Sequence, residues 1–200
     1  HLSRGHRRLR LNRGYMNRAS ARRILNSYLE VPVARFLAKL GLSPNIVTSL
    51  GLVLAGGGAY LLSAGFLWAG GIVLLASGLF DLFDGALARL TDRVTRFGAL
   101  LDSVADRVSE AVFLLGLLIY FIERPSDVGL VLVYLALVGS LMVSYLRARA
   151  EGLGIECNVG VMTRPERVVT LGIGLILGNW WLTPLLAALG LIAGLTLLTS

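Results

Sequence analysis

From residue 45 onward the chain consists of long apolar runs separated by short polar or glycine-containing stretches. A helix needs about 20 mostly apolar residues to cross the hydrocarbon core of a bilayer. The chain has 200 residues, of which 56% are hydrophobic and only 16% are charged. A soluble domain of this size could not bury that much apolar surface. The sequence therefore predicts an all-α integral membrane protein.

Six of the apolar runs are predicted to be transmembrane helices, and a segment of different character precedes them. The predicted spans are residues 45–63, 67–90, 97–122, 128–147, 166–178 and 180–198. In residues 19–40, apolar residues recur at helical spacing opposite charged ones, which predicts an amphipathic juxtamembrane helix on the membrane surface. We expect residues 1–43 to form a basic N-terminal segment with this interfacial helix, and residues 44–200 to form one six-helix transmembrane catalytic domain.

The distribution of basic residues predicts how the protein is oriented. With six spans, every Lys and Arg of the 19 except Arg124 falls on one side of the membrane. The positive-inside rule places that side, and both termini, in the cytoplasm. We therefore expect a multi-pass cell-membrane protein whose basic N-terminus contacts anionic lipid rather than nucleic acid. The single Cys157 excludes an internal disulfide framework and a cysteine-based metal site.

Four aspartates stand in two of the apolar runs, and such residues are functional candidates by default. Asp81 and Asp84 are three residues apart, and Asp102 and Asp106 are four apart, so each pair shares one face of a helix. The polar residues 89–96 between the pairs are few enough to make the two helices antiparallel neighbours, which brings the carboxylates to one depth. Oxygen ligands without His or Cys suit Mg²⁺ or Mn²⁺.

The aspartates belong to a longer pattern with fixed spacing. It runs Asp81-x2-Asp84-Gly85-x2-Ala88-Arg89-x8-Gly98-x3-Asp102-x3-Asp106. This pattern resembles the signature of the CDP-alcohol phosphotransferase (phosphatidyltransferase) family, whose members make phospholipids. The resemblance implies that a CDP-linked lipid donates its phosphatidyl group to an acceptor hydroxyl and that CMP is released. It also implies a homodimer.

The resemblance assigns roles to individual residues. It implies two divalent ions, held by Asp81, Asp84, Asp102 and Asp106. Asp106 is also the implied general base, which takes the proton of the attacking hydroxyl. The nucleotide and diphosphate are assigned to Asn45, Thr48, Asp84, Gly85, Ala88, Arg89 and Gly98.

Two further segments bear on the acceptor. Residues 144–151 read SYLRARAE and residues 164–167 read RPER, which resembles the phosphatidylinositol phosphate synthase branch of the family. The resemblance implies that the phosphate of a phosphorylated alcohol, inositol phosphate, is bound by Ser144, Arg147, Arg164 and Arg167. Arginine can make bidentate contacts to phosphate oxygens. Arg147 stands where that branch usually carries Lys, so glycerol 3-phosphate, the acceptor of a phosphatidylglycerophosphate synthase, stays the alternative.

Two other classes of function use the same acids. A cation or proton carrier would place aspartates inside the membrane, but the arginines nearby would repel a transported cation. In a membrane scaffold the acids would only pair with arginines, and the stability of the protein would not depend on metal. The sequence leaves open Mg²⁺ or Mn²⁺, and a diacyl ester or archaeal ether donor.

Overall fold

The computed structural model describes residues 30–155 and 162–199, and these residues form helices joined by short turns. These residues contain seven helices and no strand, which confirms the all-α prediction. The helices are α2 (Val31–Lys39), α3 (Pro44–Ser63), α4 (Leu67–Leu90), α5 (Arg96–Glu123), α6 (Asp127–Gly152), α7 (Arg164–Gly178) and α8 (Leu182–Thr199). The predicted interfacial helix is described only from residue 30 on. Residues 1–29 and Cys157 lie outside the described part of the chain.

The starts of the helices follow local capping chemistry. Ser43 caps α3, where its hydroxyl accepts from the Ile46 backbone N–H at 3.4 Å and Pro44 takes the first helical position. Thr95 caps α5 in the same way, accepting from the Gly98 N–H at 2.9 Å. The two caps fix the first residues of α3 and α5, within one residue of the predicted starts at 45 and 97.

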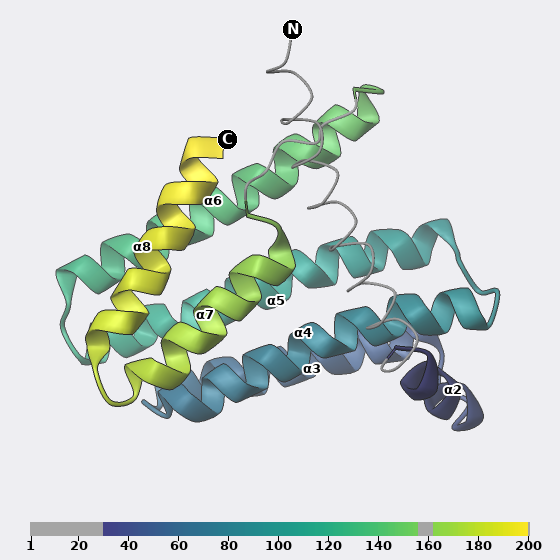
Figure 1. Cartoon of the computed structure of the whole chain (residues 1–200), viewed down its shortest axis with the longest axis horizontal. Helices are drawn as coiled ribbons and strands as arrows, with labels where there is room; N and C mark the ends of the chain where they lie inside the picture. The colour runs from purple at the N-terminus through teal and green to yellow at the C-terminus, as the bar shows by residue number, and fades with distance from the viewer. Residues whose placement is uncertain (1–29, 156–161, 200) are drawn as a thin grey trace, which may run out of the picture.

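The long helices form a bundle in two groups. α3 packs against both α4 and α5, α6 packs against α8, and α7 joins the groups by packing on α4 and α8. The α4–α5 turn lies at the opposite end of the bundle from the α3–α4, α5–α6 and α7–α8 turns (Figure 1). The short α2 packs on α4. The carboxyl end of α4 and the amino end of α5 are therefore presented at one end of the molecule.

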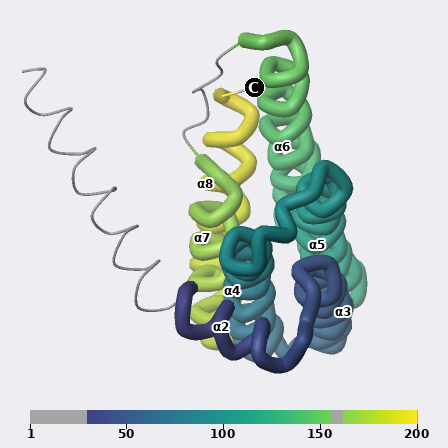
Figure 2. Tube along the Cα trace, turned by 90° about the vertical axis from the view of Figure 1, so that its right-hand side faces the viewer, coloured from purple at the N-terminus to yellow at the C-terminus, as the bar shows by residue number. Residues whose placement is uncertain are grey.

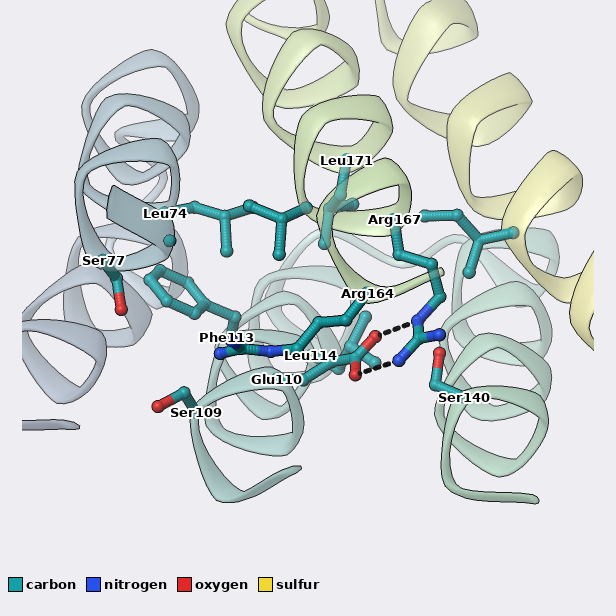
Figure 3. Close-up of a pocket in the computed structure, with 13 residues that line it drawn as sticks. Leu74, Ser77, Ser109, Glu110, Phe113, Leu114, Ser140, Arg164, Arg167 and Leu171 are labelled. Carbon is teal, nitrogen blue, oxygen red and sulfur yellow. Dashed lines mark hydrogen bonds and ion pairs between the residues drawn. The ribbon is translucent and has the colours of Figure 1, made fainter. Parts of the chain in front are cut away.

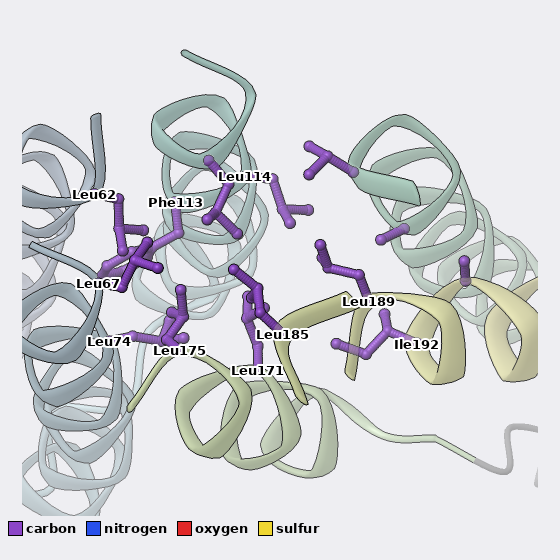
Figure 4. Packing of buried hydrophobic residues seen from close by; sticks show 14 of the residues in the cluster. Leu62, Leu67, Leu74, Phe113, Leu114, Leu171, Leu175, Leu185, Leu189 and Ile192 are labelled. Carbon is purple, nitrogen blue, oxygen red and sulfur yellow. The ribbon is translucent and has the colours of Figure 1, made fainter. Parts of the chain in front are cut away.

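An apolar core joins the two groups of helices. Leu62, Leu74 and Phe113 from α3, α4 and α5 meet Leu175 and Leu189 from α7 and α8 (Figure 4). Small residues let α3 and α5 approach closely. A Cβ at Gly58 would overlap the Phe113 ring, and one at Gly116 would overlap the backbone of Ala59. Close approach at small residues is typical of helix packing in membranes.

Four of the described helices, α3, α4, α6 and α8, are long and apolar enough to cross a membrane. This agrees with a multi-pass membrane protein. α5 has 28 residues but includes the charged site residues, and α7 has only 15 residues.

Candidate active site

Two helices bring the four aspartates to one end of the bundle. α4 carries Asp81 and Asp84, and α5 carries Asp102 and Asp106. The turn between them is tight because Asp92 adopts the left-handed backbone conformation, with φ of 53°. The two helices are antiparallel, as expected, but their strongest contacts are with α3 rather than with each other. Hollows open around the acids, where α4 and α5 contact other helices more than each other.

The first hollow lies where α3, α4 and α5 meet, and we call it the α3–α5 pocket. Its volume is about 330 Å³. It brings together all seven residues predicted to bind the nucleotide and diphosphate. It is lined by Pro44, Asn45, Thr48, Asp84, Gly85, Ala88, Arg89, Arg93, Val94, Thr95, Gly98, Ala99 and Asp102. Arg93, from the turn after α4, is a second cation in this pocket that was not among the predicted site residues, although it stands in the polar segment between the two acid pairs.

A buried hydrogen bond fixes one wall of this pocket. The Thr48 hydroxyl donates to the Asp84 carboxylate at 2.6 Å, and both residues are buried. A hydrogen bond to an ionised acceptor is stronger than one between neutral groups. Thr48 therefore holds the Asp84 side chain in a single orientation at the edge of the cavity.

Arg164 joins two of the other three carboxylates, one from α4 and one from α5. Its Nη1 lies 2.5 Å from the Asp81 Oδ2 and 2.5 Å from the Asp106 Oδ1. Asp106 Oδ1 is buried and accepts no well-oriented hydrogen bond despite this close nitrogen. The guanidinium thus neutralises charge between the two helices without fully satisfying Asp106.

The carboxylates fit a hard divalent cation by their chemistry. Among the described residues, no three His, Cys, Asp or Glu side chains are grouped as a metal site in this arrangement. Asp84 accepts a hydrogen bond from Thr48, and Asp81 and Asp106 both contact Arg164. The side-chain atoms available to a metal are nevertheless all carboxylate oxygens. Oδ2 of Asp81 and Oδ1 of Asp106 both contact the Arg164 Nη1, so they are close enough to bind one cation in place of that nitrogen. The incompletely satisfied Asp106 Oδ1 adds to this fit. That Asp81, Asp84, Asp102 and Asp106 would hold the metal stays a prediction.

The second hollow lies between α5, α6 and α7, and we call it the α5–α7 pocket. Its volume is about 120 Å³. All four residues predicted to bind the acceptor phosphate line it, together with residues of α5. The lining is Asp106, Arg107, Glu110, Val143, Ser144, Arg147, Thr163, Arg164 and Arg167. The structure therefore brings the two arginine segments of the sequence to the same cavity, with Asp106 at its edge.

One of these arginines is already paired. Arg167 donates from Nε and Nη2 to the two carboxylate oxygens of Glu110, at 2.7 and 2.8 Å (Figure 3). Its Nη1 donates to the Met162 carbonyl at 3.2 Å, and the side chain is only 4% exposed. The sequence analysis missed Glu110, although an acid one helical turn after Asp106 in an apolar helix was a usable signal.

A third hollow, the α4–α7 groove, is lined by residues of α4, α5 and α7 and has a volume of about 400 Å³. Its walls are mostly apolar, with Leu75, Leu79 and Val169 among them, and its polar part is made by the acids and Arg164. Asp102 lines both this groove and the α3–α5 pocket, and Asp106 lines both this groove and the α5–α7 pocket. Three hollows of different chemistry therefore meet at the carboxylates.

Comparisons with known proteins agree with this geometry. Residues 41–199 match the model of the CDP-alcohol phosphatidyltransferase family. The chain is 40% identical over 157 residues to a phosphatidylinositol phosphate synthase of Mycobacterium tuberculosis, covering 78% of this chain and 70% of that protein. It is 38% identical over 178 residues to an archaetidylinositol phosphate synthase of Methanothermobacter thermautotrophicus, covering 84% of this chain and 88% of that one.

Solved structures of the M. tuberculosis phosphatidylinositol phosphate synthase have the same fold. The one with CDP-DAG bound matches with a TM-score of 0.79 at 35% identity, over 86% of this chain and 90% of that chain. The one in complex with manganese and citrate matches with a TM-score of 0.80 at 35% identity, over 86% and 85% of the two chains.

Proposed function

The chain belongs to the CDP-alcohol phosphatidyltransferase family, and we propose that it transfers the phosphatidyl group of a CDP-linked lipid to a hydroxyl of inositol phosphate. The acceptor oxygen forms a bond to the phosphorus that carries the lipid, the bond from that phosphorus to CMP breaks, and the hydroxyl proton leaves. The observation that carries this proposal is that a pocket, a cationic cavity and an apolar groove all meet at four aspartates.

The donor is proposed to occupy the α3–α5 pocket and the α4–α7 groove. Arg89 and Arg93 supply positive charge for the diphosphate at the first site, and Asp84 is held in place there by Thr48. The apolar walls of the groove suit the hydrocarbon chains of the lipid. Asp102 lies at the junction of the two, where the scissile phosphate would be.

Asp106 is proposed to be the general base. It lies between the groove proposed for the donor lipid and the α5–α7 pocket proposed for the acceptor, so it can take the proton of the attacking hydroxyl. A divalent cation bound by the aspartates would neutralise the diphosphate and the charge that develops on CMP. The manganese complex of the M. tuberculosis enzyme supports a divalent metal. Two ions, and Mg²⁺ as the physiological one, are part of the proposal.

The acceptor phosphate is proposed to bind Ser144, Arg147 and Arg164 in the α5–α7 pocket. Arg164 contacts both this pocket and the acids, so cations bound to Asp81 and Asp106 would compete with it for the same oxygens. Released from the acids, its guanidinium is free to contact the phosphate. Arg167 faces the pocket but uses its nitrogens on Glu110 and Met162, so its contribution is to shape the cavity.

The proposed membrane placement completes this account. We propose that α5 and α7 also cross the membrane, which gives six spans and brings both termini and the acids to the cytoplasmic side. The positive-inside rule supports this orientation. The apolar chains of the donor would then lie in the bilayer while the nucleotide and the acceptor reach the site from the cytoplasm. A homodimer, as the family resemblance implies, is part of the same proposal.

The acceptor can be identified by supplying the purified protein with CDP-diacylglycerol, a divalent cation and one alcohol at a time. CMP release should be fastest with inositol phosphate and much slower with free inositol. A preference for glycerol 3-phosphate would instead identify a phosphatidylglycerophosphate synthase. A preference for free inositol would contradict the phosphate site, and no CMP release with any acceptor would contradict the transferase.

A further inference from the structure

A buried carboxylate outside the catalytic acids contacts the α3–α5 pocket indirectly. Glu30 stands at the start of α2 and is only 6% exposed. Its Oε2 accepts a hydrogen bond from the Arg89 Nη2 at 3.3 Å. Arg89 is near the end of α4 and lines the α3–α5 pocket. The pair therefore links the juxtamembrane helix to the proposed diphosphate site.

α2 is docked firmly enough to serve as a fixed support. Ala34 of α2 is fully buried in a small apolar cluster with Val47 of α3 and with Ala86 and Leu87 of α4. This cluster is separate from the main core of the bundle. Figure 2 shows α2, in purple, beside α4. Glu30 is thus held near Arg89 by packing that does not involve their ion pair.

Gly85 leaves room for the Arg89 guanidinium over the last turn of α4. A Cβ placed on Gly85 would lie 3.3 Å from the Arg89 Nη1, so the end of the arginine side chain lies close to the backbone at position 85. The hydrogen bond to Glu30 then fixes where this flexible side chain lies on the wall of the pocket.

The two side chains of this ion pair differ in exposure, with 61% for Arg89 and 8% for Glu30. Arg89 therefore pairs with a nearly buried carboxylate while most of its own side chain stays open to solvent at the pocket. A carboxylate beside a diphosphate site would by itself repel the ligand. An arginine held in place, however, loses less conformational freedom when it binds a phosphate.

We propose that Glu30 is a positioning residue that holds Arg89 ready for the diphosphate of the CDP-linked donor. This inference rests on the proposed function. If Glu30 only repelled the anionic donor, removing its negative charge would tighten donor binding. The inference predicts the opposite, that removing this charge weakens the binding of an anion.

The test is the affinity for CDP of the purified full chain with Mn²⁺ present, measured by calorimetry. Glu30→Ala should weaken CDP binding about 3- to 10-fold, the range expected when one long side chain loses its pre-ordering. Arg89→Ala should weaken it more. In the double variant the Glu30 substitution should add nothing, because Glu30 acts only through Arg89. Lys39→Ala, an exposed charge at the other end of α2, is the matched control and should leave binding unchanged.

Turnover provides a second readout that a purely structural role would not give. Glu30→Ala should raise the KM for CDP-diacylglycerol and leave the acceptor KM unchanged. If this variant does not purify as a folded protein, Glu30→Gln replaces it in the same cycle. Gln keeps the size of the side chain and one acceptor oxygen, so we expect a smaller loss of CDP affinity and a smaller rise in the KM for CDP-diacylglycerol.

Unchanged or tighter CDP binding in the Glu30 variant overturns the inference. So does a loss of equal size in the Arg89→Ala background, since Glu30 would then act through the docking of α2. If wild type binds CDP and the Glu30 variant binds it with the same affinity, this inference alone is contradicted. Wild type that binds no CDP contradicts the proposed function, and the inference fails with it.

Discussion

The α3–α5 pocket and the α5–α7 pocket border the same aspartates but differ in the state of their charged groups. In the first, Asp84 accepts a hydrogen bond from the neutral hydroxyl of Thr48, and the arginines lie along the rim. In the second, Arg164 is bound between Asp81 and Asp106. In the first pocket Arg89 is paired with Glu30 and can receive an anion without leaving any of the four aspartates, while in the second Arg164 must first leave Asp81 and Asp106.

This difference indicates how the two substrates are coupled. Anything that competes with Arg164 for Asp81 and Asp106, such as a divalent cation, frees positive charge for the α5–α7 pocket. The acceptor site should therefore depend on the occupancy of the acids more strongly than the nucleotide site does. Substitutions that affect one pocket and spare the other test this difference between them.

The largest effect is expected at Asp106, which borders the α5–α7 pocket but not the α3–α5 pocket. Asp106→Asn should lower kcat by about 10²- to 10⁴-fold, because an amide cannot act as the general base. The affinity for CDP should change far less. Both are measured on one preparation, by CMP release and by calorimetry. Near-normal turnover by this variant would remove Asp106 from the chemistry.

The next largest effect concerns the buried Arg167–Glu110 pair. Arg167→Ala leaves the Glu110 carboxylate without its partner in the bundle and should lower the free energy of unfolding by about 3–5 kcal/mol. The midpoint of thermal unfolding in detergent measures this loss. Arg147→Ala is the matched control, and its midpoint should stay close to that of wild type. An Arg167→Ala protein with unchanged stability and a raised acceptor KM would make Arg167 a direct ligand.

A smaller effect is expected for the arginines proposed to hold the acceptor phosphate. Arg147→Ala removes a charge-assisted contact worth about 1.5–3 kcal/mol, and so should lower kcat/KM for inositol phosphate about 10- to 150-fold. The donor KM should stay nearly constant. Steady-state kinetics with each substrate varied in turn separates the two constants. A rise in the donor KM alone would place Arg147 on the nucleotide side.

The smallest effect is expected at Thr48 in the α3–α5 pocket. Thr48→Val keeps the shape of the side chain but removes the donor to Asp84, which should weaken CDP binding by about 1 kcal/mol, or roughly 5-fold. Thr48→Ser keeps the hydroxyl and should bind CDP like wild type. Equal losses in the two variants would show that packing, rather than the hydrogen bond, matters at this position.

The sequence predicts the α3–α5 pocket well because its chemistry depends on spacing along two helices and one turn. Gly85, Ala88, Arg89 and Gly98 follow from the same pattern as the acids, and all line one cavity. The limits of α4 were also predictable, since the apolar run begins at residue 67 and the polar turn follows residue 90. Helix α6 extends to Gly152, beyond the predicted span, because Arg149 and Glu151 continue the helix after the apolar run has ended.

The pairing of charges could not be predicted in the same way. Spacing indicates which side chains share a helix face, but not which other helix packs there. The contact of Glu30 with Arg89 depends on how α2 docks, and that of Glu110 with Arg167 depends on how α7 lies against α5. The expected direct packing of α4 on α5 is weak for the same reason, since α3 packs against both.

We propose that the aspartates where the three hollows meet catalyse the transfer of the phosphatidyl group of a CDP-linked lipid to a phosphorylated alcohol, with release of CMP. The most direct test is to incubate the protein with CDP-diacylglycerol, inositol phosphate and Mg²⁺ and to quantify both products by mass spectrometry. We predict equal amounts of CMP and of a lipid carrying inositol phosphate, and neither product when a chelator is in excess. CMP accompanied by phosphatidic acid instead of that lipid, or equal turnover with the chelator, would contradict it.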